Sequence, residues 1–470
     1  MAPRLNFTVV WTSASWGTRS GKLLKVRTGK FPPYASTHSS AGNRCRRVLG
    51  KVNGMTDDAG FAAATIPSGF LWGAVRAGIK ISGNLDVAIA VAPGGAAAAA
   101  MYTSNRVVAA PVTVGRRHLL ATGGRVGAVL VNAGNANCAT GAPGIDGCVA
   151  TCVAAAETFG CIFDEVVPSS TGIIGVPFPA EKIVAAMPAL KAAIGGTQEH
   201  AEAFASAIMT TDTRLKTADA VITVNGAEAR IWGTAKGAGM IGPSLSSPVG
   251  DNAGPPHATM LVYLFTDIAA DVSELNAALA AAVASSFNSI SIDGDTSTND
   301  TVLLVASGAS GVRLTRELVA PFDAVLGEVC QSLAHQIIAD GEGVTHVVTL
   351  DIRGAASAYE AAQVARTIAN SPLCKTAWSS GDPNWGRLLA AAGRSGATFE
   401  PERVRIWIGA EPVFEYGVRA PSYNEAAAHS TMMQPEYTIT IDLGEGDGSC
   451  RFLTCDLTVE YVHINADYST

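Results

Sequence analysis

The first 56 residues contain no aspartate or glutamate, although the 470-residue chain has 40 acidic residues. This leader carries ten lysines and arginines and is rich in serine and threonine. A basic, hydroxyl-rich leader without acidic residues is typical of a mitochondrial transit peptide. A secretory signal needs a continuous apolar stretch, which the leader lacks. We therefore expect residues 1–50 to be a transit peptide that directs the protein to the mitochondrial matrix. The alternative is a tail without a targeting role.

Long hydrophobic runs are also missing. No run of about 18 apolar residues lacks glycine, polar or charged interruptions, so we expect no transmembrane helix. The most apolar stretch, Val87 to Met101, is short and rich in glycine and alanine. We predict that it forms a buried strand and a turn that leads into a helix.

Charge is scarce, since only 16% of the residues are charged and the net charge is −7. The body of the chain has no sustained basic stripe, which argues against nucleic-acid binding. Hydrophobic residues make up 48% of the chain, as in a globular protein. The length exceeds what one hydrophobic core usually supports, so we expect two or three domains.

Patterns for metals and phosphates are absent from the sequence. The nine cysteines and eight histidines form no zinc-like clusters, and we expect the thiols to be reduced. No glycine motif for a dinucleotide or a phosphate follows a predicted strand. Asp293, Asp295 and Asn299 superficially resemble a calcium loop but lack its glycine at position six and glutamate at position twelve. We predict a turn held by its own aspartate side chains there, and no metal site.

Strand and helix patterns occur in blocks and without strict βαβ alternation, which predicts an α+β fold. The predicted strands cover residues 68–75, 86–92, 126–132, 257–267, 345–352, 403–408, 437–443 and 450–462. The predicted helices cover residues 147–159, 179–195, 199–208, 272–287, 314–339 and 356–370.

Thr259 stands where a segment rich in proline, glycine and serine meets an apolar strand. The simple interpretation is a threonine that begins a strand. A sharper one is that the Ala258–Thr259 bond is cut, which gives Thr259 a free α-amino group beside its hydroxyl. An α-amino group has a pKa of about 7.7–8.0 and can take the hydroxyl proton near that pH. The pair would overcome the weakness of a threonine hydroxyl as a nucleophile.

Ten motifs from the strand near Gly69 to the last residue resemble, in the same order, those of one known family. The motifs are Val131–Cys138, Ser169–Gly175, Ile208–Thr213, Lys236–Ile241, Ala258–Leu261, Asp293–Thr301, Asp340–Gly343, Ser371–Ala377, Gly381–Arg387 and Asn465–Thr470. They are similar to the ornithine acetyltransferases, the glutamate N-acetyltransferases of arginine biosynthesis, of the fungal mitochondrial type. One such motif is weak, but ten in the same order are highly specific.

The resemblance implies roles for individual residues. Thr259 matches the nucleophile, and the Ala258–Thr259 bond matches the site of self-cleavage. Thr171 and Gly172 match an oxyanion hole, made of one hydroxyl and one backbone N–H. The substrate-binding positions match Thr210 (or Thr211, if the register is shifted by one), Lys236, Thr259, Glu342, Asn465 and Thr470. Lys236 suits a substrate carboxylate and Glu342 suits the δ-ammonium of ornithine. Without the resemblance, each would be read as a surface or turn residue.

The resemblance also implies a layered α/β sandwich of the N-terminal-nucleophile-like type with a smaller C-terminal α/β region. Cleavage would leave an α chain of residues 51–258 and a β chain of residues 259–470, associated as α2β2. The acetyl group would pass from N2-acetylornithine to glutamate through an acetyl-Thr259 intermediate in a ping-pong mechanism. No metal or organic cofactor is implied, and acetyl-CoA is a possible second donor.

The sequence departs from the family in two places. Gly242 to His257 lengthens the loop before the cleavage site, which puts the cleavage rate in doubt more than the chemistry. His346 replaces an expected lysine, which weakens a carboxylate contact or only alters the surface. Two other functions stay open. One is an N-terminal-nucleophile aminopeptidase or amidase, in which water replaces glutamate. The other is an uncleaved binding or scaffold protein that has kept the fold and lost activity.

Overall fold

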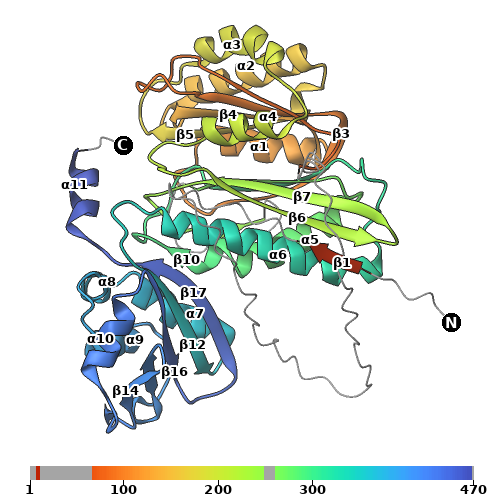
Figure 1. Cartoon of the computed structure of the whole chain (residues 1–470). Helices are drawn as coiled ribbons and strands as arrows, with labels where there is room; N and C mark the ends of the chain where they lie inside the picture. Colours follow the sequence, from red (N-terminus) through yellow and green to blue (C-terminus); the bar gives the residue numbers. More distant parts are fainter. Residues whose placement is uncertain (1–6, 11–65, 248–259, 468–470) are drawn as a thin grey trace, which may run out of the picture. The chain divides into compact units, whose positions relative to one another are not determined.

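The computed structural model describes residues 7–10, 66–247 and 260–467 (Figure 1). Ten strands of this part form one large sheet, in which β3 links two layers. They are β1 (Phe7–Val10), β2 (Leu71–Val75), β3 (Val87–Thr103), β4 (Arg125–Asn135), β5 (Val166–Ile173), β6 (Lys216–Val224), β7 (Ala227–Lys236), β8 (Leu245–Ser246), β9 (Leu261–Thr266) and β11 (Thr301–Ala306). The first half of β3 pairs with β2 and β4, and its second half pairs with β11.

Helices lie on the outer faces of these two layers, and one helix, Gln198–Ala207, packs against the core between them (Figure 1). The helices are α1 (Ala110–Ala121), α2 (Gly141–Phe159), α3 (Ala180–Ala192), α4 (Gln198–Ala207), α5 (Val272–Ala284) and α6 (Arg316–Ala339). One outer core joins α2 and α3 to the layer of β3, β4 and β5. The other joins α5 and α6 to the layer of β6, β7, β9 and β11. The predicted α+β layered sandwich is confirmed.

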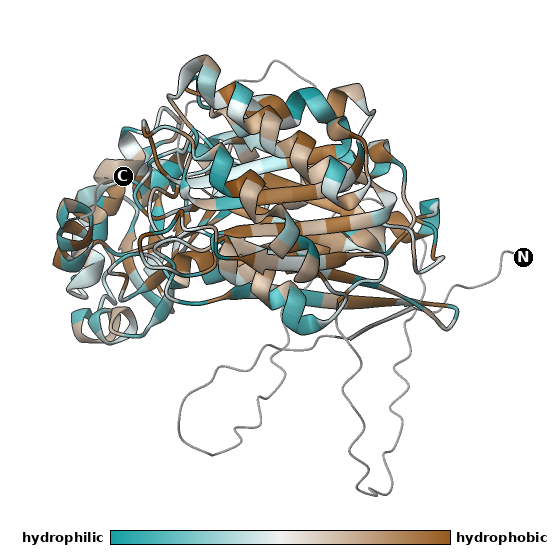
Figure 2. Cartoon of the chain, turned by 90° about the horizontal axis from the view of Figure 1, so that it is seen from above, coloured by the Kyte–Doolittle hydropathy of each residue, from teal (hydrophilic) through white to brown (hydrophobic). Residues whose placement is uncertain are grey.

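A third core lies between the two layers and is rich in aromatic side chains. Trp72 packs edge-on against Trp232 and Phe265, with ring centroids 5.9 and 5.6 Å away. These residues come from β2, β7 and β9, so one cluster ties both layers together. The strands accordingly carry mostly hydrophobic colours in Figure 2. Fully buried aromatic side chains of this size contribute strongly to stability.

The alanine-rich stretch after Val87 was predicted to turn into a helix, and that prediction is wrong. The chain continues as the single 17-residue strand β3. Alanine favours helices in isolation, but the pairing of Ala97 to Tyr102 with β11 outweighs that preference. The expected turn is instead a register shift between Val91 and Ala96, where Gly95 has a φ of +72°. Such a bulge bends a strand without ending it.

The smaller C-terminal region is confirmed as a second sheet covered by helices. Its strands are β10 (Ile290–Ser291), β12 (Val347–Ala355), β13 (Arg405–Ile408), β14 (Glu411–Glu415), β15 (Val418–Arg419), β16 (Glu436–Asp442) and β17 (Gly448–Cys455). Its helices are α7 (Ala358–Ala369), α8 (Pro372–Ser379), α9 (Trp385–Gly393), α10 (Glu425–Met432) and α11 (Val459–Asp467). Apolar side chains from α7 to α10 and from this sheet form a separate core.

One further prediction needs correction. The strand expected over residues 450–462 ends at Cys455, because Asp456 accepts the N–H groups of Thr345 and His346 and turns the chain into α11.

Within the leader, Phe7–Val10 forms β1 beside β6. Its aromatic and β-branched residues suit a strand, and the edge of β6 offers unpaired backbone groups. The rest of the leader lies outside the described residues.

Within the described ranges, no helix combines the length and apolar character needed to cross a bilayer.

Candidate active site

The ends of several strands meet at one edge of the large sheet. Lys236, the last residue of β7, pairs with Leu261 at the start of β9. Leu261 pairs on its other side with Thr301 at the start of β11. Thr301 in turn pairs with Tyr102 near the end of β3. These pairings bring residues that are far apart in the sequence together beside Met260, the first described residue after position 259.

The predicted oxyanion-hole residues lie at the end of β5, next to this edge. Thr171 is 1% exposed, and the Lys236 ammonium donates to its Oγ1 at 3.3 Å. Because the lysine occupies a lone pair, the hydroxyl keeps its own proton for another acceptor. Gly172 has a φ of +129°, and a Cβ there would lie 2.4 Å from the backbone carbon of Gly134. Only glycine fits at this position without moving the strand.

Gly172→Ala is therefore expected to displace the backbone N–H that the resemblance assigns to the oxyanion. We expect the rate of acetyl transfer to fall by about a hundredfold or more, as when one oxyanion donor is removed. Steady-state kinetics on the purified variant measures this. Gly175→Ala is the control, because its φ is also positive, at +81°, but a Cβ there meets nothing within 4 Å. Equal losses in both variants would show that strain at a glycine, and not the oxyanion hole, lowers the rate.

Lys236 is the charged centre of the site. Its side chain is buried, with 3% exposure, and is not the surface lysine that the sequence alone would favour. Burial lowers its pKa, and the neighbouring carboxylates of Asp212, Asp300 and Glu342 act in the opposite direction. A buried ammonium beside the Thr171 hydroxyl can bind a substrate carboxylate through a charge-assisted hydrogen bond.

A buried ion cluster supports Lys236 from behind. Lys216 Nζ lies 2.6 Å from Asp212 Oδ1 and 2.5 Å from Asp340 Oδ2, and all three side chains are at most 3% exposed. Asp212 also accepts the N–H of Gly237 at 2.7 Å. Burial disfavours the charged form of Asp212, but Lys236 and Lys216 outweigh burial and hold its pKa at about 2. Asp212 is therefore ionised and fixes the turn after Lys236.

The other predicted binding residues lie around the same turn. Thr210 N donates to Asp212 Oδ2 at 3.0 Å. The carboxylate of Glu342 lies over Gly239, where a Cβ would come within 2.2 Å of Oε2. Asn465 on α11 donates to Glu342 Oε2 at 2.9 Å. Contacts around one turn thus connect five of the described predicted residues, Thr171, Thr210, Lys236, Glu342 and Asn465, and Gly172 follows Thr171 in the chain.

Ala258, Thr259 and Thr470 lie outside the described residues. Met260, the first residue after the predicted nucleophile, is fully buried, and its N–H donates to the carboxylate of Asp300. Its carbonyl oxygen accepts the N–H of Thr301 at 3.0 Å. The residue that follows Thr259 is therefore anchored at the same edge as Lys236.

Sequence reasoning missed four charged residues of this site. Asp212, Asp340 and Asp300 lie inside quoted motifs, but nothing in their spacing shows that Asp212 and Asp300 lie near Lys236 or that Asp340 pairs with Lys216. Lys216 lies in no quoted motif, and its partner Asp340 is far along the chain. The sequence signal that could have pointed to them was the occurrence of aspartates beside the glycines and threonines of the quoted motifs.

The turn predicted at Asp293 is confirmed. Its carboxylate accepts the N–H groups of Met240, Ile241 and Asp295. Burial raises the pKa of Asp293 to about 6. Among the described residues, no three or more histidine, cysteine, aspartate or glutamate side chains form a group that could hold a metal ion. His346 is buried, with its Nδ1 2.8 Å from the carbonyl of Gln434, so it does not merely alter the surface.

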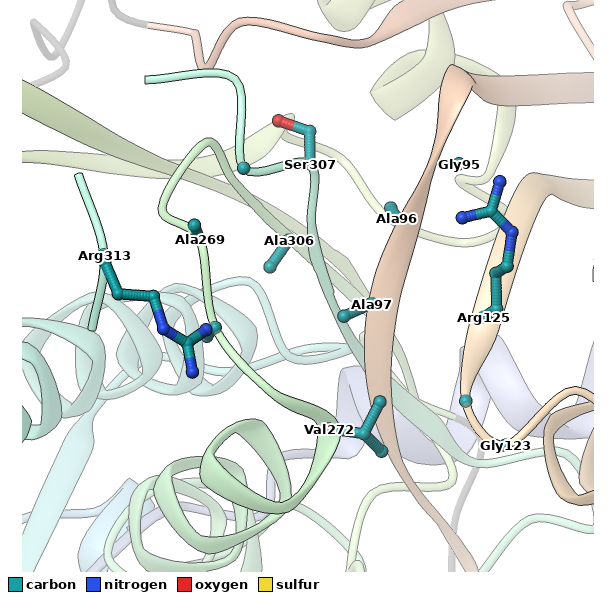
Figure 3. A pocket seen from close by; sticks show the side chains of 13 residues that line it. Gly95, Ala96, Ala97, Gly123, Arg125, Ala269, Val272, Ala306, Ser307 and Arg313 are labelled. Carbon is teal, nitrogen blue, oxygen red and sulfur yellow. The ribbon is translucent and has the colours of Figure 1, made fainter. Parts of the chain in front are cut away.

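A cavity of about 300 Å³ opens at a different place in the large sheet (Figure 3). It is lined mainly by glycine and alanine, with Arg125 and Arg313 on opposite sides. It touches β11 at Ala306, the end opposite Thr301. None of the predicted site residues lines it. Both arginines already pair with carboxylates, Arg125 with Glu165 and Arg313 with Asp271.

Comparison with known proteins decides the family. The ArgJ family pattern matches residues 71–470. The chain belongs to the ArgJ family. This confirms the resemblance to the ornithine acetyltransferases that the ten motifs indicated.

Curated members of the ArgJ family match nearly their whole length. The arginine biosynthesis bifunctional protein ArgJ of Thermus thermophilus is 45% identical over 87% of this chain and 100% of its own. That of Chlorobaculum tepidum is 43% identical over 86% of this chain and 96% of its own. The crystal structure of ArgJ from Bacillus halodurans is 37% identical, with a TM-score of 0.42, and covers 45% of this chain and 100% of that chain.

Proposed function

We propose that this ArgJ family member is a self-cleaving N-acetyltransferase that carries the acetyl group of N2-acetylornithine to glutamate through an ester on Thr259. The observation that carries the proposal is the contact between buried Lys236 and the Thr171 hydroxyl beside Gly172. The Lys236 ammonium and the Thr171 hydroxyl are thus in contact beside Gly172, and Lys236 pairs with Leu261 at the start of β9. The names of the relatives, which place them in arginine biosynthesis with two functions, support it.

Cleavage comes first in this proposal. The Thr259 hydroxyl attacks the carbonyl carbon of Ala258, and the acyl group moves from the Thr259 nitrogen to its oxygen. Water then hydrolyses this ester, which releases a carboxylate on Ala258 and a free α-amino group on Thr259. No separate protease is needed, and the new amine is the base that the hydroxyl otherwise lacks.

Transfer follows in two half-reactions. The Thr259 oxygen attacks the acetyl carbonyl of N2-acetylornithine, while the α-amino group takes the hydroxyl proton. The Thr171 hydroxyl and the Gly172 N–H stabilise the negative oxygen of the tetrahedral intermediate. The ornithine nitrogen leaves with the proton, and acetyl-Thr259 remains. The amine of glutamate then attacks this ester, and the same steps run in reverse to give N-acetylglutamate.

The two chains are expected to stay together after cleavage. β9 and β11 of the β chain lie side by side in one sheet, where β9 pairs with β7 and β11 pairs with β3 of the α chain. Separation would break these ladders and open the aromatic core. We extend the proposal to an α2β2 assembly, in line with the family expectation. Sedimentation of the purified protein tests it, and a mass of one α and one β chain would contradict it.

The remaining parts of the proposal concern donors and location. The chemistry above needs no metal or organic cofactor. We propose acetyl-CoA as a second acetyl donor, because the relatives are named bifunctional. An assay with acetyl-CoA and glutamate, without acetylornithine, tests that activity directly. The basic leader supports import into the mitochondrial matrix, with removal of about the first 50 residues. An α chain that still begins at Met1 in the organelle would contradict import with cleavage.

Glu342→Gln is expected to separate the two substrates. Ornithine carries a δ-ammonium where glutamate carries a carboxylate, so a negative side chain favours the first and repels the second. We expect the KM for acetylornithine to rise about tenfold and the KM for glutamate to stay constant or fall. Glutamine keeps an oxygen for Asn465 Nδ2. The exposed Glu425→Gln on α10 is the control; a rise of both KM values in Glu342→Gln would contradict the assigned contact.

One assay separates the transferase from the aminopeptidase or amidase. The processed enzyme is given acetylornithine with and without glutamate. We expect N-acetylglutamate to form and the release of ornithine to depend on glutamate. Release of acetate at a rate that glutamate does not change would support the hydrolase. A single uncut chain without either activity would support the scaffold.

A further inference from the structure

Asp300 is a buried carboxylate for which the transfer mechanism above has no use. It lies just before β11 and is fully buried. One carboxylate oxygen, Oδ1, accepts the N–H of Met260. The other, Oδ2, is buried and has no hydrogen-bond partner in the structure as described. Buried polar atoms nearly always have partners, so an unpaired carboxylate oxygen points to a group that is still missing.

The backbone around Asp300 is held firmly. Its carbonyl oxygen accepts the N–H of Thr103 at 2.9 Å. The neighbouring Asn299 donates its Nδ2 to the carbonyls of Ser170 at 2.9 Å and Ala136 at 2.7 Å. Asp300 is therefore fixed relative to the end of β5, where Thr171 and Gly172 lie. It cannot easily turn away to find another partner for Oδ2.

A positively charged group would satisfy this oxygen, because an ionised carboxylate that is fully buried needs a countercharge. Burial raises the pKa of Asp300 well above its ordinary range, and the Met260 N–H and the Lys236 ammonium only partly oppose this. Lys236 is the charged side chain that faces it, and that lysine is shared with Asp212 and Glu342. In the uncut chain the carboxylate thus lacks a countercharge of its own.

Cleavage would create such a countercharge at this place. The Met260 nitrogen that Asp300 holds is bonded to the carbonyl carbon of Thr259. The α-amino group of cleaved Thr259 is separated from that nitrogen by only the Cα and carbonyl carbons. We propose that Asp300 holds the α-amino group of processed Thr259 and stabilises the ammonium that forms during acetyl transfer. Asp300 is then a positioning residue that acts through the amine, and this inference rests on the function proposed above.

The proton balance defines what Asp300 does. In each half-reaction the amine takes the hydroxyl proton and becomes an ammonium, and it returns that proton to the leaving nitrogen. Beside the ammonium, Asp300 is held in its ionised form, and it gains no proton in the step. It favours the ammonium over the neutral amine, as a third group orients and stabilises a general base in other nucleophile–base pairs. If Asp300 only anchors Met260, its charge has no effect on the pH dependence.

Asp300→Asn tests the charge while keeping an oxygen for the Met260 N–H. A carboxylate raises the pKa of a neighbouring amine, so its removal lowers that pKa. Since the neutral amine is the base, the acidic limb of kcat/KM should move down by about one pH unit. The plateau should fall about a hundredfold, the size expected when general-base catalysis is impaired. Activity is expressed per chain that begins at Thr259, as counted by mass spectrometry.

Asp267→Asn is the matched control. Asp267 is also a buried aspartate that accepts backbone N–H groups, from Arg230 and Ser68, and burial raises its pKa too. It follows the far end of β9, about 20 Å from Met260 at the usual rise per strand residue. We expect the control to keep the wild-type acidic limb and rate per folded chain. Asp300→Glu keeps the negative charge. If Asp300→Asn is not cleaved, the pH profile is measured on Asp300→Glu.

The outcomes separate this inference from the function on which it rests. The proposal is supported if the acidic limb of kcat/KM shifts in Asp300→Asn and not in the control Asp267→Asn. If Asp300→Asn stays uncut, the proposal is supported when Asp300→Glu is cleaved and keeps the wild-type limb. A wild-type limb and rate in Asp300→Asn, with an inactive Thr259→Ala variant, overturns the role of Asp300 alone. If neither Asp300 variant is cleaved, the residue serves folding or cleavage and the proposal is wrong. Activity in Thr259→Ala would overturn the proposed function itself.

Discussion

Thr259→Ala is expected to leave the chain uncut and to lower acetyl transfer by about 10⁴-fold or more. The alanine has no hydroxyl to attack the carbonyl of Ala258, so no α-amino group is released. It also has no oxygen to carry the acetyl group, and the oxyanion donors Thr171 and Gly172 then have no tetrahedral intermediate to stabilise. Removal of a nucleophile typically leaves only the small residual rate that binding provides. A denaturing gel measures cleavage, and single-turnover kinetics measures transfer.

Two further variants serve as comparisons for Thr259→Ala. Thr259→Ser keeps a hydroxyl and should retain part of both cleavage and transfer. Thr158→Ala removes a hydroxyl that donates to the Ala154 carbonyl inside α2 and should leave both unchanged. Full activity in Thr259→Ala would contradict the proposed chemistry. Loss of cleavage without loss of transfer would show that another residue carries the acetyl group.

Lys216→Met is expected to lower the free energy of unfolding by about 3–5 kcal/mol. The change leaves the carboxylates of Asp212 and Asp340 buried without the ammonium that lies within 2.6 Å of both. Removing one partner of a buried ion pair costs this much because the remaining charge is uncompensated. Asp212 also holds the turn that follows Lys236, so the folded fraction should lose transfer activity as well. Urea denaturation followed by circular dichroism measures the stability.

Arg353→Met is the matched control for this change. Arg353 also pairs with an aspartate, Asp351, but its side chain is 62% exposed. Exposed ion pairs contribute about 0–1 kcal/mol, so this variant should unfold close to the wild type. Equal stability of Lys216→Met and wild type would mean that the cluster is not buried in solution. A destabilised but fully active variant would show that Asp212 does not support the site.

The sequence predicted the fold class because strands and helices with clear periodicity, such as those at β4 and α6, depend on local pattern. The predictions from sequence fail where contacts between distant segments of the chain determine the local structure. Ala97 to Tyr102 are extended because β11, about 200 residues later, pairs with them. The chain after Cys455 turns because Asp456 binds Thr345 and His346, which precede it by more than 100 residues. No local pattern contains such information.

The candidate site was likewise predicted only in part from the sequence. Motif resemblance located Thr171, Gly172, Lys236 and Glu342. The structure connects Thr171, Lys236 and Glu342 by contacts around the turn after β7, and Gly172 follows Thr171. Periodicity could not show that Lys236 is buried or that Lys216 joins Asp212 to Asp340. Those facts depend on how β6, β7 and the end of α6 pack. Likewise, only the structure shows that one carboxylate oxygen of Asp300 accepts the Met260 N–H and that the other has no partner among the described residues.

The identity of the chain ends in active enzyme is the most direct test of the proposal that Thr259 is both the cleavage product and the nucleophile. Purified, active protein is separated under denaturing conditions, and the N-terminus of each fragment is sequenced by mass spectrometry. We expect two chains in equal amounts, one beginning at Thr259 and the other near residue 51. Fully active protein in which the Ala258–Thr259 bond is intact would contradict the mechanism.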